Sequence, residues 1–141
     1  MNKKNTLLLF LCLFTLWAVA QEKKPVKIAC VGNSITYGSG IKNQFQNSYP
    51  GLLSQLLGEG YDVRNFGISA RVMLNKGDHP YMHEQKFRDL LAFQPDIVTI
   101  KLGTNDSKPW NWCYGKDFGK DLTEMLDILQ DLLCLAPAVI L

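Results

Sequence analysis

Three short clusters of glycine and polar residues each follow a strand-like stretch of the sequence. They are Gly-Asn-Ser-Ile-Thr at 32–36, Asn-Phe-Gly-Ile-Ser at 65–69 and Gly-Thr-Asn-Asp at 103–106. The carboxyl ends of parallel strands meet at one edge of a sheet, where the ligand sites of open α/β sheets lie. We therefore expect the three clusters to converge on one site.

Ser34, in the first cluster, is a candidate nucleophile. A serine just past a strand can begin a helix, where unpaired amides and the helix dipole stabilise negative charge. Such a position suits a nucleophile whose carbonyl adduct becomes an oxyanion. A turn with a helix cap explains this cluster equally well when it is considered alone, because asparagine and serine are favoured caps. Three such clusters after three successive strands favour an active site.

Other kinds of glycine-containing or metal site fit less well. Gly32 and Gly38 are not followed by the lysine and serine that a phosphate-binding P-loop needs. No Gly-x-Gly-x-x-Gly occurs either. The lipase-type Gly-x-Ser-x-Gly turn is absent, since Thr36 stands where its second glycine should be. No Cys-x-x-Cys is present, so a structural zinc is not supported. We expect neither a cofactor nor a metal.

The elements that must position these clusters alternate between strands and helices. Apolar or β-branched runs predict strands at 26–31, 61–68, 96–102 and 138–141. Apolar residues at helical spacing predict helices at 52–57, 87–93 and 117–135. This alternation predicts a three-layer α/β/α sandwich with a parallel, flavodoxin-like sheet, in which the chain stops early in the fourth strand. The strand at 96–102 should be central.

The first residues have the pattern of a secretory signal peptide, predicted at 1–20. Two lysines precede an apolar run from Leu7 to Trp17 that is too short to span a bilayer comfortably. The small residues ending at Ala20 fit a signal-peptidase site, so the mature chain should begin near Gln21. We expect a secreted or periplasmic protein with one partial domain at 21–141 and no stable membrane anchor.

Composition excludes some classes of partner. The 141 residues are 47% hydrophobic and 20% charged, which is typical of one modest globular domain. The formal net charge is +2, and the lysines and arginines are scattered along the chain. Neither a nucleic-acid surface nor an electrostatic membrane anchor is indicated.

The three clusters resemble three of the four sequence blocks of the SGNH, or GDSL-like, hydrolases. Those blocks are a serine in Gly-Asp-Ser or Gly-Asn-Ser, a glycine, an asparagine in Gly-x-Asn-Asp, and a distant Asp-x-x-His. The resemblance implies Ser34 as nucleophile and an oxyanion hole made by the Ser34 amide, the Gly67 amide and the Asn105 side chain. It covers about residues 26–141, and Leu-Gly-Thr-Asn-Asp at 102–106 is its most specific part.

The fourth block, Asp-x-x-His, does not occur in this sequence. In the family that the chain resembles, it supplies the histidine that deprotonates the serine during acyl transfer. The two histidines present, His79 and His83, lie between the second and third clusters, where the family does not place its base. We expect them to be loop residues that contact solvent or substrate. The chain is therefore expected to be a truncated form of a longer enzyme, weakly active or inactive by itself.

Trp110 and Trp112 follow the third cluster, on a loop that should border the pocket. Exposed tryptophans there can stack on a sugar ring, although packing of this loop on the long helix explains them as well. Together with secretion, they make the chain similar to the carbohydrate O-acetylesterases of the superfamily, including the sialate O-acetylesterase-like group. A short acyl ester on a glycan is the expected substrate. A lipase, a thioesterase and a non-catalytic glycan-binding remnant are the alternatives.

Overall fold

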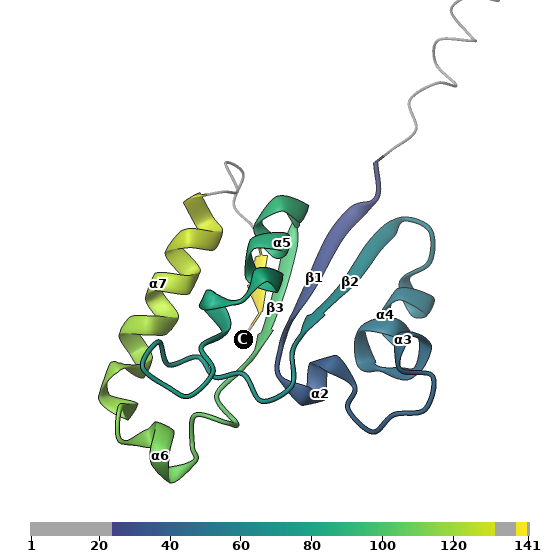
Figure 1. The fold of residues 1–141 in the computed structure, drawn as a ribbon. Coiled ribbons are helices and arrows are strands. Elements are labelled where there is room, and N and C mark those ends of the chain that lie inside the picture. Colours follow the sequence, from purple (N-terminus) through teal and green to yellow (C-terminus); the bar gives the residue numbers. More distant parts are fainter. Residues whose placement is uncertain (1–23, 132–137, 141) are drawn as a thin grey trace, which may run out of the picture.

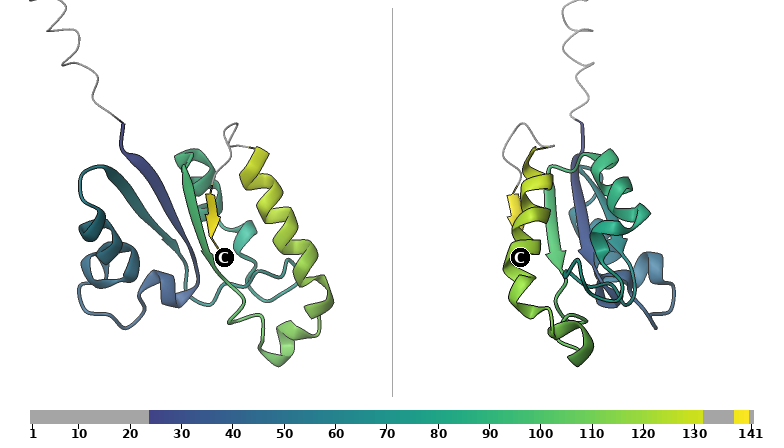
Figure 2. Two further views of the ribbon diagram at one scale, coloured as in Figure 1. Left: turned by 180° about the vertical axis from the view of Figure 1, so that it is seen from behind. Right: turned by 60° about the vertical axis from the view of Figure 1, so that its left-hand side comes forward.

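A parallel four-stranded sheet lies at the centre of the computed structural model, which describes residues 24–131 and 138–140 (Figure 1). Its strands are β1 (Val26–Gly32), β2 (Tyr61–Gly67), β3 (Ile97–Lys101) and β4 (Ala138–Ile140). They lie in the order β2-β1-β3-β4, which is the flavodoxin-like order. Figure 2 shows β4, in yellow, beside β3 at one side of the sheet. The parallel sheet predicted from the sequence is confirmed.

The strands β1 and β3 lie in the interior of the sheet. β1 pairs with β2 on one side and β3 on the other, and Ala29, Cys30 and Val31 have no exposed surface. A strand covered on both faces has no solvent side, so its apolar residues run on without alternation. β3 lies between β1 and β4, which confirms the predicted central place of the strand at 96–102.

Helices of very different length connect the strands. The three longer ones are α4 (Tyr49–Leu57), α5 (Gln85–Phe93) and α7 (Phe118–Asp131). The short ones are α2 (Ser34–Tyr37), α3 (Gln44–Asn47), α6 (Pro109–Trp112) and the 3-10 turns η1 (Tyr81–His83) and η2 (Gly115–Asp117). All three helices predicted from apolar spacing are present. Single turns such as α3 and α6 are too short to show such spacing, so the sequence did not predict them.

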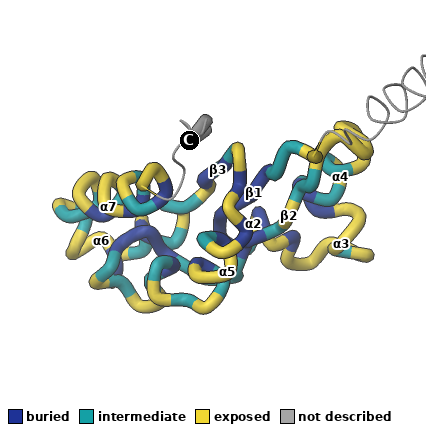
Figure 3. The backbone as a smooth tube through the Cα atoms, turned by 90° about the horizontal axis from the view of Figure 1, so that it is seen from above, coloured by how far each residue is buried: buried dark blue, intermediate teal, exposed yellow. Residues whose placement is uncertain are grey.

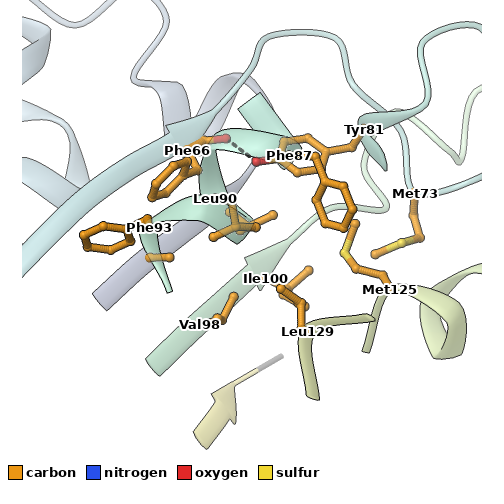
Figure 4. Close-up of a cluster of buried hydrophobic side chains, with 12 residues drawn as sticks. Phe66, Met73, Tyr81, Phe87, Leu90, Phe93, Val98, Ile100, Met125 and Leu129 are labelled. Carbon is orange, nitrogen blue, oxygen red and sulfur yellow. Dashed lines mark hydrogen bonds between the residues drawn. The ribbon is translucent and has the colours of Figure 1, made fainter. Parts of the chain in front are cut away.

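The longer helices cover both faces of the sheet. α5 and α7 contribute to one buried cluster with β1 and β3, in which Leu90 and Met125 are fully buried (Figure 4). α4 lies on the opposite face, where the Tyr49 hydroxyl and Thr99 Oγ1 are 3.0 Å apart. In the view from above, the sides of α4 and α7 that face away from the sheet are exposed (Figure 3). The predicted three-layer α/β/α sandwich is confirmed.

Three predictions concern residues outside those that the structure describes. They are the signal peptide at 1–20, the last turn of the long helix at 132–135, and the end of the fourth strand at 141. Within the described ranges, no helix is long and apolar enough to cross a membrane.

Tyr81 joins the long loop after β2 to the sheet. Its side chain is fully buried and packs edge-on against Phe87, with ring centroids 6.1 Å apart. The Tyr81 hydroxyl donates a hydrogen bond of 2.6 Å to the carbonyl oxygen of Phe66 in β2 (Figure 4). Burial raises the pKa of Tyr81 far above its usual range, so the hydroxyl stays protonated and remains a donor. The start of α5 is thereby fixed to the strand that precedes the loop.

We expect Tyr81→Phe to lower the free energy of unfolding by about 1 kcal/mol, because it removes the buried hydrogen bond from the Tyr81 hydroxyl to the Phe66 carbonyl oxygen. Urea unfolding followed by circular dichroism measures the change. Tyr114→Phe is the matched control, since Tyr114 is exposed and should change stability by less than about 0.5 kcal/mol. Equal effects of the two substitutions would contradict the assigned hydrogen bond.

Candidate active site

The three polar clusters lie at the same end of the sheet, as the sequence predicted. Gly32 at the end of β1 pairs with Gly67 of β2 on one side and with Lys101 of β3 on the other. The loops that follow these strands lie at one end of the molecule (Figure 1). Because β2 and β3 flank β1, the residues after β1 lie where the chain order reverses, which is the usual ligand position in such sheets.

Two glycines allow α2 to pack closely on the strand ends. A Cβ on Gly32 would overlap Thr36 Oγ1 and come within 2.8 Å of the Lys101 carbonyl oxygen. A Cβ on Gly67 would overlap the main-chain amide of Tyr37. Both neighbours of α2 must therefore lack a side chain for the helix to lie where it does.

Ser34 is the first residue of α2 and is partly exposed. The preceding residue, Asn33, is fully buried, and its Oδ1 accepts a 3.1 Å hydrogen bond from the amide of Ile35. This cap fixes the direction of the first turn. α2 has only four residues, so the predicted help from a helix dipole is small, and the local amides supply most of the positive potential. The Ser34 amide is one of these, because a first helical residue has no partner within its own helix.

The structure gives Gly67 a different role from the one predicted. Its amide donates a 2.8 Å hydrogen bond to Asn65 Oδ1, so it is already occupied and is not presented as an oxyanion donor. Asn65 Nδ2 in turn donates to the carbonyl oxygen of Thr36 at 2.9 Å. Asn65 and Gly67 thus hold α2 against β2. The glycine is needed for packing, and its hydrogen-bonded amide argues against the predicted place in the oxyanion hole.

Ala70 is a candidate oxyanion donor that the sequence did not indicate. It has a φ of 67°, in the left-handed region that costs a residue with a side chain about 1–2 kcal/mol. Within the described residues, its amide donates to no acceptor. The next residue, Arg71, accepts a 3.0 Å hydrogen bond from Asn105 Nδ2 on its carbonyl oxygen. Strained backbone of this kind is common at functional sites, and the Ala70 amide replaces that of Gly67 as the candidate donor.

Asn105 is held beside this turn by the buried residue that follows it. Asp106 is fully buried, and its carboxylate accepts hydrogen bonds from the amides of Leu74, at 2.8 Å, and Gly103, at 3.1 Å. Gly103 has a φ of 105°, so a glycine is favoured where β3 turns into this loop. Only one of the two Asn105 amide hydrogens is used on Arg71, which leaves the other for a ligand.

His79 and His83 are both exposed, as the sequence predicted for loop histidines. His79 lies in the loop after β2, where its carbonyl oxygen accepts from the amide of Val72 at 3.1 Å, and His83 lies in η1. Among the hydrogen bonds of the described residues, none joins Ser34 to either histidine. The structure therefore does not present either of them as the base for Ser34.

Trp110 and Trp112 lie on α6, next to the third cluster, with 60% and 55% of their surface exposed. The Trp112 ring is 6.4 Å from the ring of Phe118 at the start of α7. Trp110 instead donates from Nε1 to Asp78 Oδ2 at 3.1 Å. Packing on the long helix therefore describes Trp112, whereas Trp110 belongs to a polar cluster.

A groove of about 1000 Å³ lies elsewhere, between β2 and helices α3 and α4. Its walls include Tyr37, Phe45 and Arg64, but neither Ser34 nor Asn105. The groove is therefore separate from the candidate site at the strand ends.

The chain belongs to the GDSL-like Lipase/Acylhydrolase family, whose pattern residues 30–141 match. An acetylxylan esterase from Xylanibacter ruminicola (strain ATCC 19189 / DSM 19721 / CIP 105475 / JCM 8958 / 23) is 55% identical to it over 111 residues. These residues are 79% of this chain and 23% of that protein. The chain thus spans less than a quarter of the length of this relative.

Two solved structures have a similar fold. AlinE4, an SGNH-hydrolase family esterase, aligns with 79% of this chain and 56% of its own at a TM-score of 0.57 and 23% identity. Est24, a carbohydrate acetylesterase from Sinorhizobium meliloti, aligns with 81% of this chain and 60% of its own at a TM-score of 0.61 and 21% identity. At these identities, the likeness supports the shared fold alone.

We expect Asp106→Asn to lower the free energy of unfolding by about 2–4 kcal/mol, because an amide group would face one of the two donors with its own N–H atoms. Urea unfolding measures the loss. Asp127→Asn, on the exposed side of α7, is the matched control and should change stability by less than about 0.5 kcal/mol. A loss below this value for Asp106→Asn would show that its carboxylate does not hold the loops.

Ala70→Gly should raise the free energy of unfolding by up to about 1 kcal/mol, because relief of the left-handed strain exceeds the added entropy of the unfolded chain. Ala92→Gly, on the exposed side of α5, should lower it by about 1 kcal/mol. Thermal unfolding of both variants shows whether each substitution raises or lowers the free energy of unfolding. A destabilised Ala70→Gly protein would contradict the left-handed conformation of Ala70.

Proposed function

We propose that this chain carries the nucleophile and the oxyanion hole of a serine esterase that removes acetyl groups from a carbohydrate. The observation that carries the proposal is the grouping of Ser34, Ala70 and Asn105 at the carboxyl ends of three adjacent strands. Each residue offers an N–H group that the described structure leaves free, and Ser34 also offers a partly exposed hydroxyl. Membership of an acylhydrolase family supports this chemistry.

In the proposed reaction, the hydroxyl oxygen of Ser34 attacks the ester carbonyl and loses its proton to a general base. The carbonyl oxygen becomes an oxyanion, stabilised by the amides of Ser34 and Ala70 and by Nδ2 of Asn105. The C–O bond to the sugar then breaks, and the sugar leaves with the proton from the base. Water, deprotonated by the same base, hydrolyses the acetyl-serine and releases acetate.

The general base is proposed to be a histidine outside these 141 residues, whose two histidines are His79 and His83. Neither His79 nor His83 is hydrogen-bonded to Ser34, and the acetylxylan esterase relative is more than four times longer than the matched segment. A serine hydroxyl without its base is a poor nucleophile, although an oxyanion hole alone retains a small part of the catalysis. We therefore expect the 141 residues alone to be weakly active.

The substrate is proposed to be an O-acetyl ester of a polysaccharide outside the cell or in the periplasm. The name of the relative from Xylanibacter ruminicola supports an acetylated xylan. Exposed Trp110, next to the loop at 103–106 that carries Asn105 (the oxyanion loop), supplies aromatic surface that can stack on a sugar ring. A secreted protein, as the leader at 1–20 predicts, meets such a substrate.

The test is hydrolysis of p-nitrophenyl acetate by the purified chain, compared with Ser34→Ala and with the matched control Ser54→Ala in α4. We expect Ser34→Ala to reduce the rate to the uncatalysed background and Ser54→Ala to leave it within about twofold. A rate that survives Ser34→Ala would contradict the assigned nucleophile.

The same three proteins, assayed on p-nitrophenyl octanoate and on acetylated xylan, distinguish a lipase from a carbohydrate esterase. Faster Ser34-dependent turnover of the octanoate would favour the lipase. No Ser34-dependent turnover of any ester, combined with binding of xylan, would favour a glycan-binding protein without catalysis.

A further inference from the structure

Asp78 makes three hydrogen bonds to two adjacent residues of α6. Its Oδ2 accepts from Trp110 Nε1 at 3.1 Å, and its Oδ1 accepts from Asn111 Nδ2 at 3.1 Å. The Asp78 amide donates back to Asn111 Oδ1 at 2.9 Å. An otherwise exposed loop residue is thus bonded to α6 through all of its strong polar groups except its carbonyl oxygen.

Asn111 extends this set of bonds to the oxyanion loop. The side chain of Asn111 is 1% exposed, and its Nδ2 also donates to the carbonyl oxygen of Asn105 at 3.0 Å. The close approach depends on Gly77, because a Cβ there would come within 2.6 Å of Val72 Cγ2 and 3.1 Å of Asn111 Oδ1. The Trp110 indole is therefore joined to the Asn105 main chain through three successive hydrogen bonds.

The two tryptophans of α6 differ in what holds them. Gly115 lies against the face of the Trp112 ring, where a Cβ would come within 2.8–3.0 Å of three ring carbons, and Phe118 lies on the same ring. Trp112 therefore packs within its own loop. Trp110 is fixed by its ring nitrogen, and Lys108 Nζ lies 5.6 Å from the ring centroid. With 60% of its surface exposed, the Trp110 ring is both oriented and accessible.

The charge on Asp78 suits this arrangement. Partial loss of water around the carboxylate favours its neutral form, but hydrogen bonds from Trp110 and Asn111, together with electrostatic attraction to His79, outweigh this effect and lower the pKa of Asp78. The group is therefore ionised at neutral pH. A carboxylate has only acceptors, so it can hold both N–H donors at once.

We propose that Asp78 is a positioning residue that fixes the Trp110 ring as the stacking platform for one sugar unit of the substrate, and joins that platform to Asn105 through Asn111. The inference rests on the proposed function insofar as the substrate is a glycan. A ring that is already held before binding loses little conformational entropy when a sugar stacks on it, which increases affinity. The hydrogen bonds that run from Trp110 through Asp78 and Asn111 to Asn105 also keep the stacked sugar at a constant distance from the oxyanion loop.

The test is a double-mutant cycle on the binding of xylohexaose, measured by isothermal titration calorimetry with the 141-residue chain. Asp78→Ala and Trp110→Ala are made separately and together, all in a Ser34→Ala background so that acetylated oligosaccharides can be compared without hydrolysis. We expect Trp110→Ala to weaken binding about tenfold and Asp78→Ala several-fold. In the double variant, Asp78→Ala should add less than about twofold to the loss from Trp110→Ala, because its effect passes through that ring.

Two further measurements separate positioning from general damage. The indole N–H resonance of Trp110, assigned by its loss in Trp110→Phe, should shift in Asp78→Ala, whereas that of Trp112 should not. Trp112→Phe is the matched aromatic control, and should leave the affinity within about twofold because that ring packs on Gly115 and Phe118.

An Asp78→Ala effect of equal size in the presence and absence of Trp110 would overturn the proposal. Undetectable binding of xylohexaose and of its acetylated form by the parent chain would overturn it as well. Failure of the esterase assignment is distinct, since it appears as hydrolysis that does not depend on Ser34, and the binding cycle is carried out without Ser34.

Discussion

The buried carboxylate of Asp106 is the interaction on which the candidate site depends. It accepts hydrogen bonds from Leu74, in the long loop after β2, and from Gly103, at the end of β3. A fully buried charge is stable only when such donors compensate for its loss of water, so the two loops are held together. These contacts hold Asp106, the residue after Asn105, and the carbonyl oxygen of Asn105 itself accepts a hydrogen bond from Asn111. The side chain of Asn105 can therefore point in few directions.

A second constraint acts on the nucleophile side of the site. Gly32, Gly67 and Asn65 hold α2 against the ends of β1 and β2, which places Ser34 directly after the strand that lies between β2 and β3. Sheet order alone then brings Ser34 near the loops of both neighbours. The site thus combines rigid packing at α2 with a hydrogen-bonded frame around Asn105.

Local sequence patterns predicted the strands, the longer helices and the convergence of three clusters, because these follow from apolar spacing and from the geometry of a parallel sheet. The patterns did not predict the partner of the Gly67 amide or the left-handed conformation of Ala70. Both depend on how neighbouring loops pack after folding. The bond between Asp78 and Trp110 joins residues 32 positions apart, and no local pattern indicates it.

A crystal structure of the chain after reaction with a p-nitrophenyl alkylphosphonate tests the site most directly, since the phosphonate on a serine resembles the tetrahedral intermediate. We expect the phosphorus on Ser34 Oγ, and one phosphoryl oxygen about 2.7–3.1 Å from the amides of Ser34 and Ala70 and from Asn105 Nδ2. The Gly67 amide should remain bonded to Asn65. A phosphoryl oxygen bound by the Gly67 amide, or a phosphonate on any residue other than Ser34, would contradict this account of the site.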